Sequence, residues 1–233
     1  MKGETMAFEL TFIGHASLAL ETSGYKLLVD PYLTGNPVAT VNAKEVEADY
    51  ILITHGHGDH IGDTIEIAKR TGAKVISNAE ISGWLKKKGL AVHGQHIGGG
   101  YTHPFGYLKL TLALHGSKLP DGSDGGHSAG LLLTTNDGEK IYMAGDTGLF
   151  GDMCLIGEEG VTLAVLPIGD NYTMGPTDAL RAVKLLEPEH VIPIHYNTFK
   201  LIEQDADAWA ESVRAETNAK VHLLKPGERF VYP

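Results

Sequence analysis

Apolar and polar positions alternate every two residues over much of the first third of the chain, which is typical of half-buried β-strands. Five segments are predicted as strands, either on this basis or as short apolar runs: 8–13, 17–21, 25–29, 48–53 and 74–76. Apolar residues at helical spacing predict two helices among them, at 63–70 and 80–88. Gly72 and Gly89 lie just after these helices, as expected of residues that end a helix.

A second strand-rich stretch runs from about residue 91 to residue 144 and contains the hairpin signal Asn136-Asp137-Gly138. From residue 161 onward, strands alternate with helices. The predicted strands of this half are 108–114, 131–133, 141–143, 163–168, 191–194 and 221–224, and the predicted helices are 177–186 and 205–216. Meandering strands early in each half, with helices mixed in, predict an α/β fold in which two sheets pack face to face with helices outside them. The expected architecture is a four-layer αββα sandwich.

The composition fits one soluble domain over residues 1–233. Hydrophobic residues make up 42% of the chain and charged residues 21%, and no Pro- or Ser-rich linker interrupts it. The formal charge of −10 argues against broad capture of nucleic acid or of an anionic membrane. Residues 1–6 hold no apolar signal segment and the single Cys154 excludes an internal disulfide, so we expect a cytoplasmic protein. The sequence leaves open whether the protein forms a homo-oligomer.

The segment His55-Gly56-His57-Gly58-Asp59-His60 carries most of the functional information. It follows the predicted strand 48–53, and side chains of extended backbone repeat every two residues, so the first two histidines point the same way. A turn at the second glycine sends the carboxylate and the third histidine toward another point. Most histidines in proteins ligate nothing, but a solvated loop has no reason to collect three imidazoles and a carboxylate. The segment therefore predicts a metal site, and it favours two ions over one.

Three further donors follow apolar strands later in the chain: His115, Asp146 and His195. Strands that deliver their donors to one edge would build a site at the rim of the sandwich. Imidazole with carboxylate suits zinc, and also manganese, iron or nickel, because no thiolate among these donors narrows the choice.

The order of these residues along the chain resembles that of the metallo-β-lactamase superfamily of binuclear hydrolases. The same order includes Asp30 after an early strand and Gly145-Asp146 before the last histidine. Within that superfamily it is similar to a branch of metal-dependent hydrolases related to ascorbate-phosphate lactonases, through the segments 145–153, 166–169 and 195–199.

The resemblance implies a role for each donor. The implied ligands are His55, His57 and His115 for one ion, Asp59, His60 and His195 for the other, and Asp146 as a bridge between them. Asp30 would hold a ligand histidine from outside the site. β-Lactamases of the common type carry cysteine at the bridging position and are exported, and ribonuclease-Z-like enzymes add an RNA-gripping arm that we do not find. Neither activity is expected here.

The ligand set predicts hydrolysis of a small ester, lactone or phosphoester by a bridging hydroxide. Two divalent ions, two carboxylates and neutral histidines leave a local charge of about +2, which favours an anionic substrate. Asp59, bound through one oxygen, would orient or deprotonate the attacking water with the other. The alternative is a metal-binding sensor or another non-hydrolytic metalloprotein. Oxygen reduction, one form of it, usually needs a flavin domain, for which no residues remain.

The candidate substrate contacts are predicted only from their positions in the sequence. His127 lies in a Gly-rich loop, where a solvated histidine is an equally good interpretation, and Asn171 follows the predicted strand 163–168. Tyr196 and Asn197 lie beside the last histidine ligand. On the same ground, Tyr172 is a candidate pocket residue, and His15, at a strand end, is a candidate to support a ligand.

Overall fold

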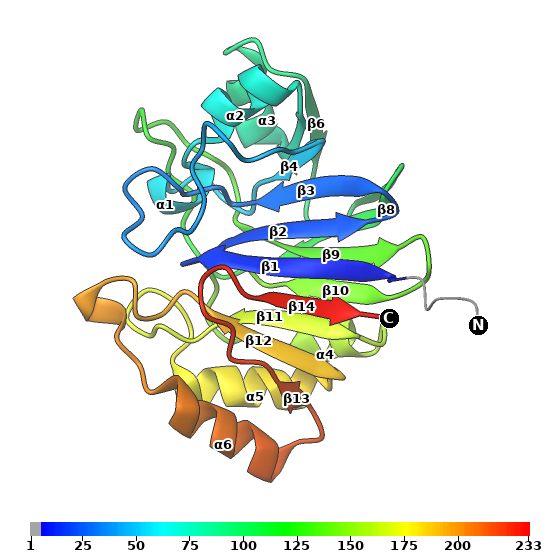
Figure 1. The fold of residues 1–233 in the computed structure, drawn as a ribbon, viewed down its shortest axis with the longest axis vertical. Helices are drawn as coiled ribbons and strands as arrows, with labels where there is room; N and C mark the ends of the chain where they lie inside the picture. Colours follow the sequence, from blue (N-terminus) through cyan, green and yellow to red (C-terminus); the bar gives the residue numbers. More distant parts are fainter. Residues whose placement is uncertain (1–5) are drawn as a thin grey trace.

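Two seven-stranded sheets form the centre of the molecule in the computed structural model, which describes residues 6–233 (Figure 1). The strand order is β14-β1-β2-β3-β4-β5-β6 in the first sheet and β13-β12-β11-β10-β9-β8-β7 in the second. Residues 1–5, part of the segment predicted to lack a signal sequence, lie outside the described residues.

Both sheets combine an antiparallel half with a parallel half. The first sheet contains β1 (Phe8–Gly14), β2 (Ser17–Thr22), β3 (Tyr25–Val29), β4 (Tyr50–Leu52), β5 (Lys74–Asn78), β6 (Val92–Gln95) and β14 (Arg229–Tyr232). Its strands β3 to β6 are parallel, and the other pairings are antiparallel. The second sheet contains β7 (Gly100–His103), β8 (Gly106–Leu112), β9 (Ala129–Thr135), β10 (Lys140–Met143), β11 (Leu163–Pro167), β12 (His190–Ile194) and β13 (Lys220–Val221). There, β10 to β13 are parallel.

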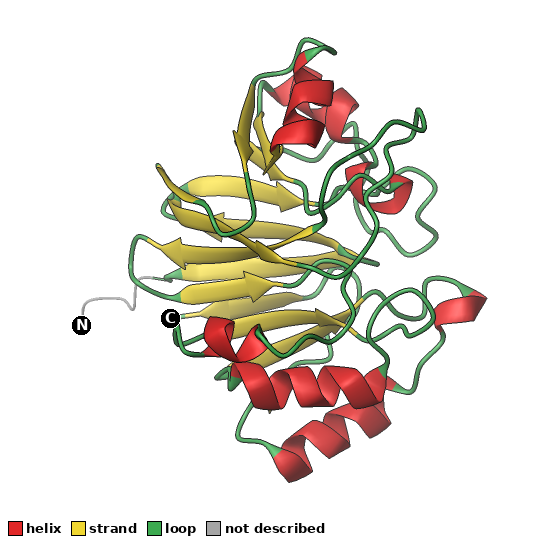
Figure 2. Cartoon of the chain, turned by 180° about the vertical axis from the view of Figure 1, so that it is seen from behind, coloured by secondary structure: helices red, strands yellow, loops and turns green. Residues whose placement is uncertain are grey.

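Helices cover the outer faces of the two sheets. They are α1 (Gly58–Ile61), α2 (Thr64–Thr71), α3 (Ala79–Lys86), α4 (Met153–Gly157), α5 (Pro176–Leu186) and α6 (Ala206–Glu216), with one 3-10 turn, η1 (Lys200–Ile202). Helices α2 and α3 pack on the first sheet and α4 to α6 belong to the second, so the strands lie between two groups of helices (Figure 1, Figure 2).

Three hydrophobic cores separate the four layers. The central core joins the sheets, with Leu20 on one side and Leu110 on the other. An outer core places Ile67 of α2 against the first sheet, and a second places Ala182 of α5 against the opposite sheet. The alternation of buried and exposed residues along β2 shows why the sequence pattern has a period of two, because only one face of that strand meets the central core.

The structure confirms the predicted αββα sandwich, and the four predicted helices match α2, α3, α5 and α6 closely. The predicted strand 221–224 is wrong beyond Val221, where β13 ends and the chain turns toward β14. β14 itself was not predicted, because at this edge position only Phe230 of its four residues is buried and the alternation is short. At Gly58 the expected turn is a short helix, α1. Within residues 6–233 no helix is both long and apolar enough to pass through a lipid bilayer.

Candidate metal centre

All seven predicted ligands lie at one edge of the sandwich. The parallel strands place their carboxyl ends at this edge, and Asp30, Asp146 and His195 follow β3, β10 and β12. In open parallel sheets this is where ligands bind. The loops and α1 project at this side, opposite the C-terminus (Figure 1). The fold thereby brings together donors that are up to 140 positions apart in the chain, His55 and His195 among them.

The first cluster contains three histidines. Nε2 of His55 lies 3.0 Å from Nδ1 of His57, and Nε2 of His115 lies 3.2 Å from the same atom. Such spacing is expected of neighbouring ligands around one ion, because zinc–nitrogen bonds of about 2.0–2.1 Å at a tetrahedral angle separate the nitrogens by slightly more than 3 Å. The three atoms could accept one ion between them, as the resemblance implied.

The second cluster is centred on Asp146. Its Oδ1 lies 3.2 Å from Nε2 of His60, and its Oδ2 lies 3.1 Å from Nε2 of His195. Oδ2 also lies 3.5 Å from Nε2 of His115, so this carboxylate reaches both clusters. Among the described residues, Nε2 of His60, Oδ1 of Asp146 and both ring nitrogens of His195 are buried without a hydrogen-bond partner. Buried polar atoms that face one another unpaired are costly, and a cation between them would remove that cost.

Asp30 fixes the orientation of two of the predicted ligand histidines. Its carboxylate is buried and accepts hydrogen bonds from the Thr54 hydroxyl at 2.6 Å and the Thr54 amide at 2.9 Å. Nδ1 of His60 lies 2.8 Å from the same carboxylate, so this nitrogen carries a proton and donates to Asp30, which leaves Nε2 as the ring atom that a metal would bind. The Thr54 hydroxyl proton is already donated to Asp30, so Nδ1–H of His55 donates to Thr54 and its Nε2 is also free for a metal.

Thr54 was missed by the sequence analysis, although it directly precedes the ligand motif. The predicted role of Asp30 behind a ligand histidine fits the observed geometry. Helix α1, which carries Asp59 and His60, packs tightly against the loop after β3. At Gly62, where α1 ends with a φ of +33°, a Cβ atom would lie 2.3 Å from the Pro31 carbonyl oxygen. Only glycine allows this approach.

The electrostatics match a site for cations. Burial alone would raise the pKa of Asp146, but His60 and His195 hold it well below its usual range, so the group is a carboxylate. Burial also lowers the pKa of His55 well below its usual value, and its imidazole is therefore neutral. An ionised carboxylate and a neutral imidazole are the forms that bind metals.

A small cavity of about 230 Å³ opens onto the two clusters. It is lined by His57, Asp59, His115, Asp146, Tyr172 and His195. Tyr172, considered from its position, therefore does line the cavity. The nominated substrate contacts His127, Asn171, Tyr196 and Asn197 are not in this lining.

The structure accounts differently for these four residues. Tyr196 packs against the core between the second sheet and its helices, and the Asn197 amide donates to the Gln204 carbonyl. His127 and Asn171 are exposed, and the backbone carbonyl of His127 accepts a hydrogen bond from Asn78. Although the Tyr196 ring is partly used in packing, a substrate contact stays a prediction for all four residues.

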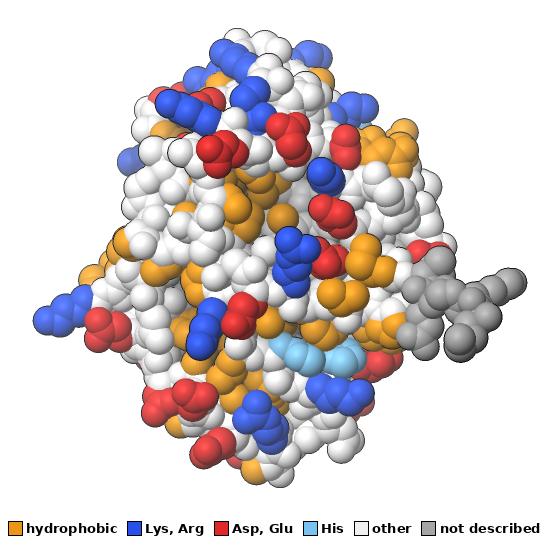
Figure 3. Space-filling view, in the orientation of Figure 1, with side chains coloured by type: hydrophobic (Ala, Val, Ile, Leu, Met, Phe, Trp, Pro, Cys, Tyr) orange, Lys and Arg blue, Asp and Glu red, His pale blue; other side chains and the backbone are white. Residues whose placement is uncertain are grey.

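The surface outside the site shows no concentration of one charge on the face drawn in Figure 3. Lysine and arginine side chains are scattered among aspartate and glutamate there, with hydrophobic side chains between them.

Known proteins resemble the chain over almost its whole length. Residues 25–196 match the family described as the beta-lactamase superfamily domain. A UPF0173 metal-dependent hydrolase of Heliobacterium modesticaldum is 47% identical, over 94% of this chain and 95% of its own length. The UPF0173 metal-dependent hydrolase YtkL of Bacillus subtilis is 48% identical, over 88% and 92% of the two chains. The structure of Igni18, a metallo hydrolase from Ignicoccus hospitalis, shares 40% identity and a TM-score of 0.90, covering 97% of this chain and 98% of its own.

Proposed function

The chain belongs to the beta-lactamase superfamily and is a metal-dependent hydrolase of the metallo-β-lactamase fold, and within that class we propose that it uses two divalent metal ions to hydrolyse a small ester, lactone or phosphoester. The observation that carries the proposal is the position of Asp146 between two histidine clusters. A single ion would need only one of these clusters. Zinc is the first choice of metal, since the donors are imidazoles and carboxylates in neighbouring-ligand spacing.

The residues present fit two such ions. His55, His57 and His115 would hold one, and Asp59, His60 and His195 the other, with Asp146 shared between them. Bound divalent ions supply Lewis acidity and lower the pKa of a shared water to about 7. In the proposed reaction, the chain's own residues orient the reactants and exclude bulk water.

Asp59 and Tyr172 are the residues that meet the substrate in this scheme. The Asp59 side chain is 37% exposed at the cavity mouth, and its pKa is held below its usual range by a hydrogen bond from His15 against the effect of burial. A carboxylate whose pKa is lowered in this way is a weak base. We therefore assign Asp59 to orienting the water rather than deprotonating it. Tyr172 is exposed beside it and offers an aromatic face to the substrate.

The substrate class follows from charge and volume. Two divalent ions against Asp59 and Asp146 leave a local charge of about +2, which favours an anionic substrate or transition state. A cavity of about 230 Å³ holds a small molecule rather than a polymer. An acidic protein whose lone Cys154 is exposed and unpaired also fits a reducing compartment such as the cytoplasm.

Purified protein reconstituted with zinc tests the proposal. Metal content should reach two ions per chain, and a screen of lactones, phosphodiesters, thioesters and β-lactams should give turnover with at least one of the first three classes. Activity should rise through neutral pH and then level. One ion at saturation would contradict the binuclear site, and two ions without turnover on any class would favour a metal sensor.

A further inference from the structure

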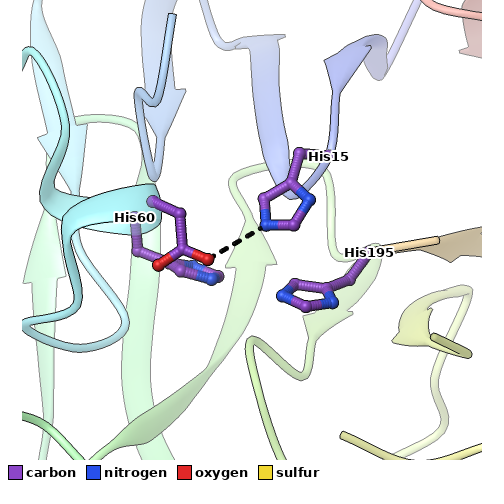
Figure 4. A group of neighbouring side chains, drawn as sticks. His15, His60 and His195 are labelled. Carbon is purple, nitrogen blue, oxygen red and sulfur yellow. Dashed lines mark hydrogen bonds and ion pairs between the residues drawn. The ribbon is translucent and has the colours of Figure 1, made fainter. Parts of the chain in front are cut away.

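His15 is a buried histidine at the metal centre that belongs to neither implied ligand set. It lies in the turn between β1 and β2, and Figure 4 shows its ring beside His60 and His195 with a hydrogen bond to a neighbouring carboxylate. That carboxylate is Asp59, whose Oδ2 lies 3.3 Å from Nε2 of His15. On the other side of the ring, Nδ1 lies 3.0 Å from the hydroxyl oxygen of Thr198. The imidazole thus connects the loop after β12 to the helix that carries Asp59.

The backbone holds His15 in a conformation that a histidine rarely adopts. Its φ is +61°, in the left-handed region, where a hairpin turn usually has glycine or asparagine. Gly14 before it has a φ of +138°, and a Cβ atom there would lie 3.0 Å from the Val38 side chain. The His15 carbonyl accepts a hydrogen bond of 2.8 Å from the amide of His195, which is also left-handed at +56°. Such conformations persist where the surroundings impose them, and they are concentrated at functional sites.

The hydrogen bonds of the ring define its tautomer. Nε2 of the ring faces a carboxylate oxygen of Asp59, and Nδ1 faces the hydroxyl of Thr198. A carboxylate accepts only, whereas a threonine hydroxyl can donate. Both contacts are satisfied when Thr198 donates to Nδ1 and Nε2–H donates to Asp59. The opposite tautomer would direct a nitrogen lone pair at the carboxylate oxygen.

We propose that His15, itself oriented by Thr198, is a positioning residue that holds Asp59 in the geometry required by the second metal ion. The hydrogen bond to Oδ2 leaves Oδ1 of Asp59 as the oxygen available to the ion. It also restrains a side chain that is partly exposed and would otherwise sample several rotamers. This inference rests on the proposed binuclear function and extends it to residues that the ligand pattern does not include.

A direct role as a ligand is the rival arrangement. His15, Asp59, His60 and His195 each offer a ligand atom, and these atoms all lie within 4.8 Å of one another. In that arrangement Nδ1–H would donate to Thr198 and Nε2 would bind the ion. The two arrangements differ in what glutamine can replace, because a glutamine amide donates a hydrogen bond as Nε2–H does but is a poor substitute for an imidazole ligand.

Stepwise zinc affinities, measured in the full chain by titration against a chelating dye, separate these arrangements without reference to activity. In His15→Ala, the affinity for the second ion should fall by about 10–100-fold and that for the first should stay unchanged. His15→Gln should recover most of the loss. Thr198→Val should show a smaller loss and Thr198→Ser almost none, while His96→Ala, a change of an exposed histidine, should behave as the parent.

Two results would overturn the proposal. If His15→Gln is as weak as His15→Ala while Thr198→Ser is normal, the imidazole is itself a ligand. If His15→Ala keeps both affinities, the residue only fills space. The thermal transition of the metal-free protein shows whether His15→Ala folds. If it does not fold, Thr198→Val and Thr198→Ser decide alone, and equal affinities of these two variants for the second ion would overturn the proposal. A parent that binds two ions but hydrolyses nothing would refute the hydrolytic function and leave this test intact.

Discussion

Strand β12 has a histidine at each end, and the two have opposite surroundings. After its carboxyl end, His195 is buried, and its Nε2 lies 3.1 Å from Asp146. At its amino end, His190 is half-buried, and its Nδ1 lies 2.8 Å from Nε2 of His222. Among the described residues, no carboxylate forms an ion pair with His190 or His222. The histidines at the two ends of this strand therefore lie in different chemical surroundings.

The comparison shows that acidic partners, rather than a high density of histidines, distinguish the metal centre. At the rim, Asp146 faces Nε2 of both His60 and His195, and Asp30 holds His60 from behind, so these ring nitrogens are directed toward one point. At the other end, the ring nitrogens of His190 and His222 form a hydrogen bond with each other. The lone pair that a metal would need accepts this hydrogen bond instead. Substitutions can remove these distinguishing features one at a time.

Asp146→Asn should have the largest effect, because it leaves the rim with histidines that lack the shared carboxylate. The amide keeps the volume but removes the charge that both clusters face. We expect the affinities for both ions and the turnover to fall by more than the about 10–100-fold typical of an outer partner. Zinc titration and kinetics on one sample measure this. The control is Asp152→Asn, which changes an exposed carboxylate six positions later in the chain. Normal metal content in Asp146→Asn would contradict the bridging role of this carboxylate.

Asp30→Ala should have the next largest effect. Without this carboxylate, the Nδ1 proton of His60 and the hydroxyl of Thr54 lose their acceptor, and the two ligand histidines can take other tautomers. Metal affinity or activity should fall by about 10–100-fold while the protein stays folded. Circular dichroism and metal analysis test the two parts separately. Full metal content with full turnover would show that Asp30 only ends a strand.

Asp59→Asn should act mainly on turnover. The asparagine keeps the size and one possible ligand oxygen, but it removes the charge that orients the water and accepts the hydrogen bond from His15. The kcat should therefore fall by a larger factor than the KM rises. Metal content must be measured on the same preparation, because loss of the second ion would give the same kinetics. Parent-like turnover with both ions bound would refute the role of Asp59.

Local pattern was sufficient to predict the sandwich and most of its helices. The period of two in β1 and β2 and the period of 3.6 in α5 are both imposed by the faces that each element buries. β14 was missed because its pairing with β1 joins segments more than two hundred residues apart, and no local signal encodes that contact. α1 was missed because a single turn of helix has too few residues to show a period.

The candidate ligands have a clearer sequence signal than the residues that support them. A candidate ligand can be recognised by its residue type and by its position after a strand, as with His195 after β12. Thr54 and Thr198 are ordinary threonines in the sequence, and only the fold shows that their hydroxyls orient the rings of His55 and His15. The cavity wall has no such signal, because only the fold shows that Tyr172 lines the cavity while Tyr196 packs against the core between the second sheet and its helices.

The smallest effect on metal binding is expected for the double change His190→Gln and His222→Gln, at the other end of β12. Zinc affinities and turnover should match the parent, because these side chains hold each other and face away from the clusters. Stability should change with pH instead. Burial, with Lys220, lowers the pKa of His190, and burial, with His190 and Lys220, lowers the pKa of His222.

A histidine whose pKa is lowered by folding binds protons more readily in the unfolded chain, so the parent loses stability as pH falls through about 6.5 toward the lowered folded values. Above that range, both states are neutral at these sites and the loss is absent. The double variant should therefore lose less stability than the parent between about pH 7 and pH 5. Urea unfolding of the metal-free proteins across this range measures the difference, with His96→Gln as an exposed-histidine control. Equal slopes for parent and double variant would show that the pair titrates as solvated histidines do. A change in zinc affinity would show that the two ends of β12 are not independent.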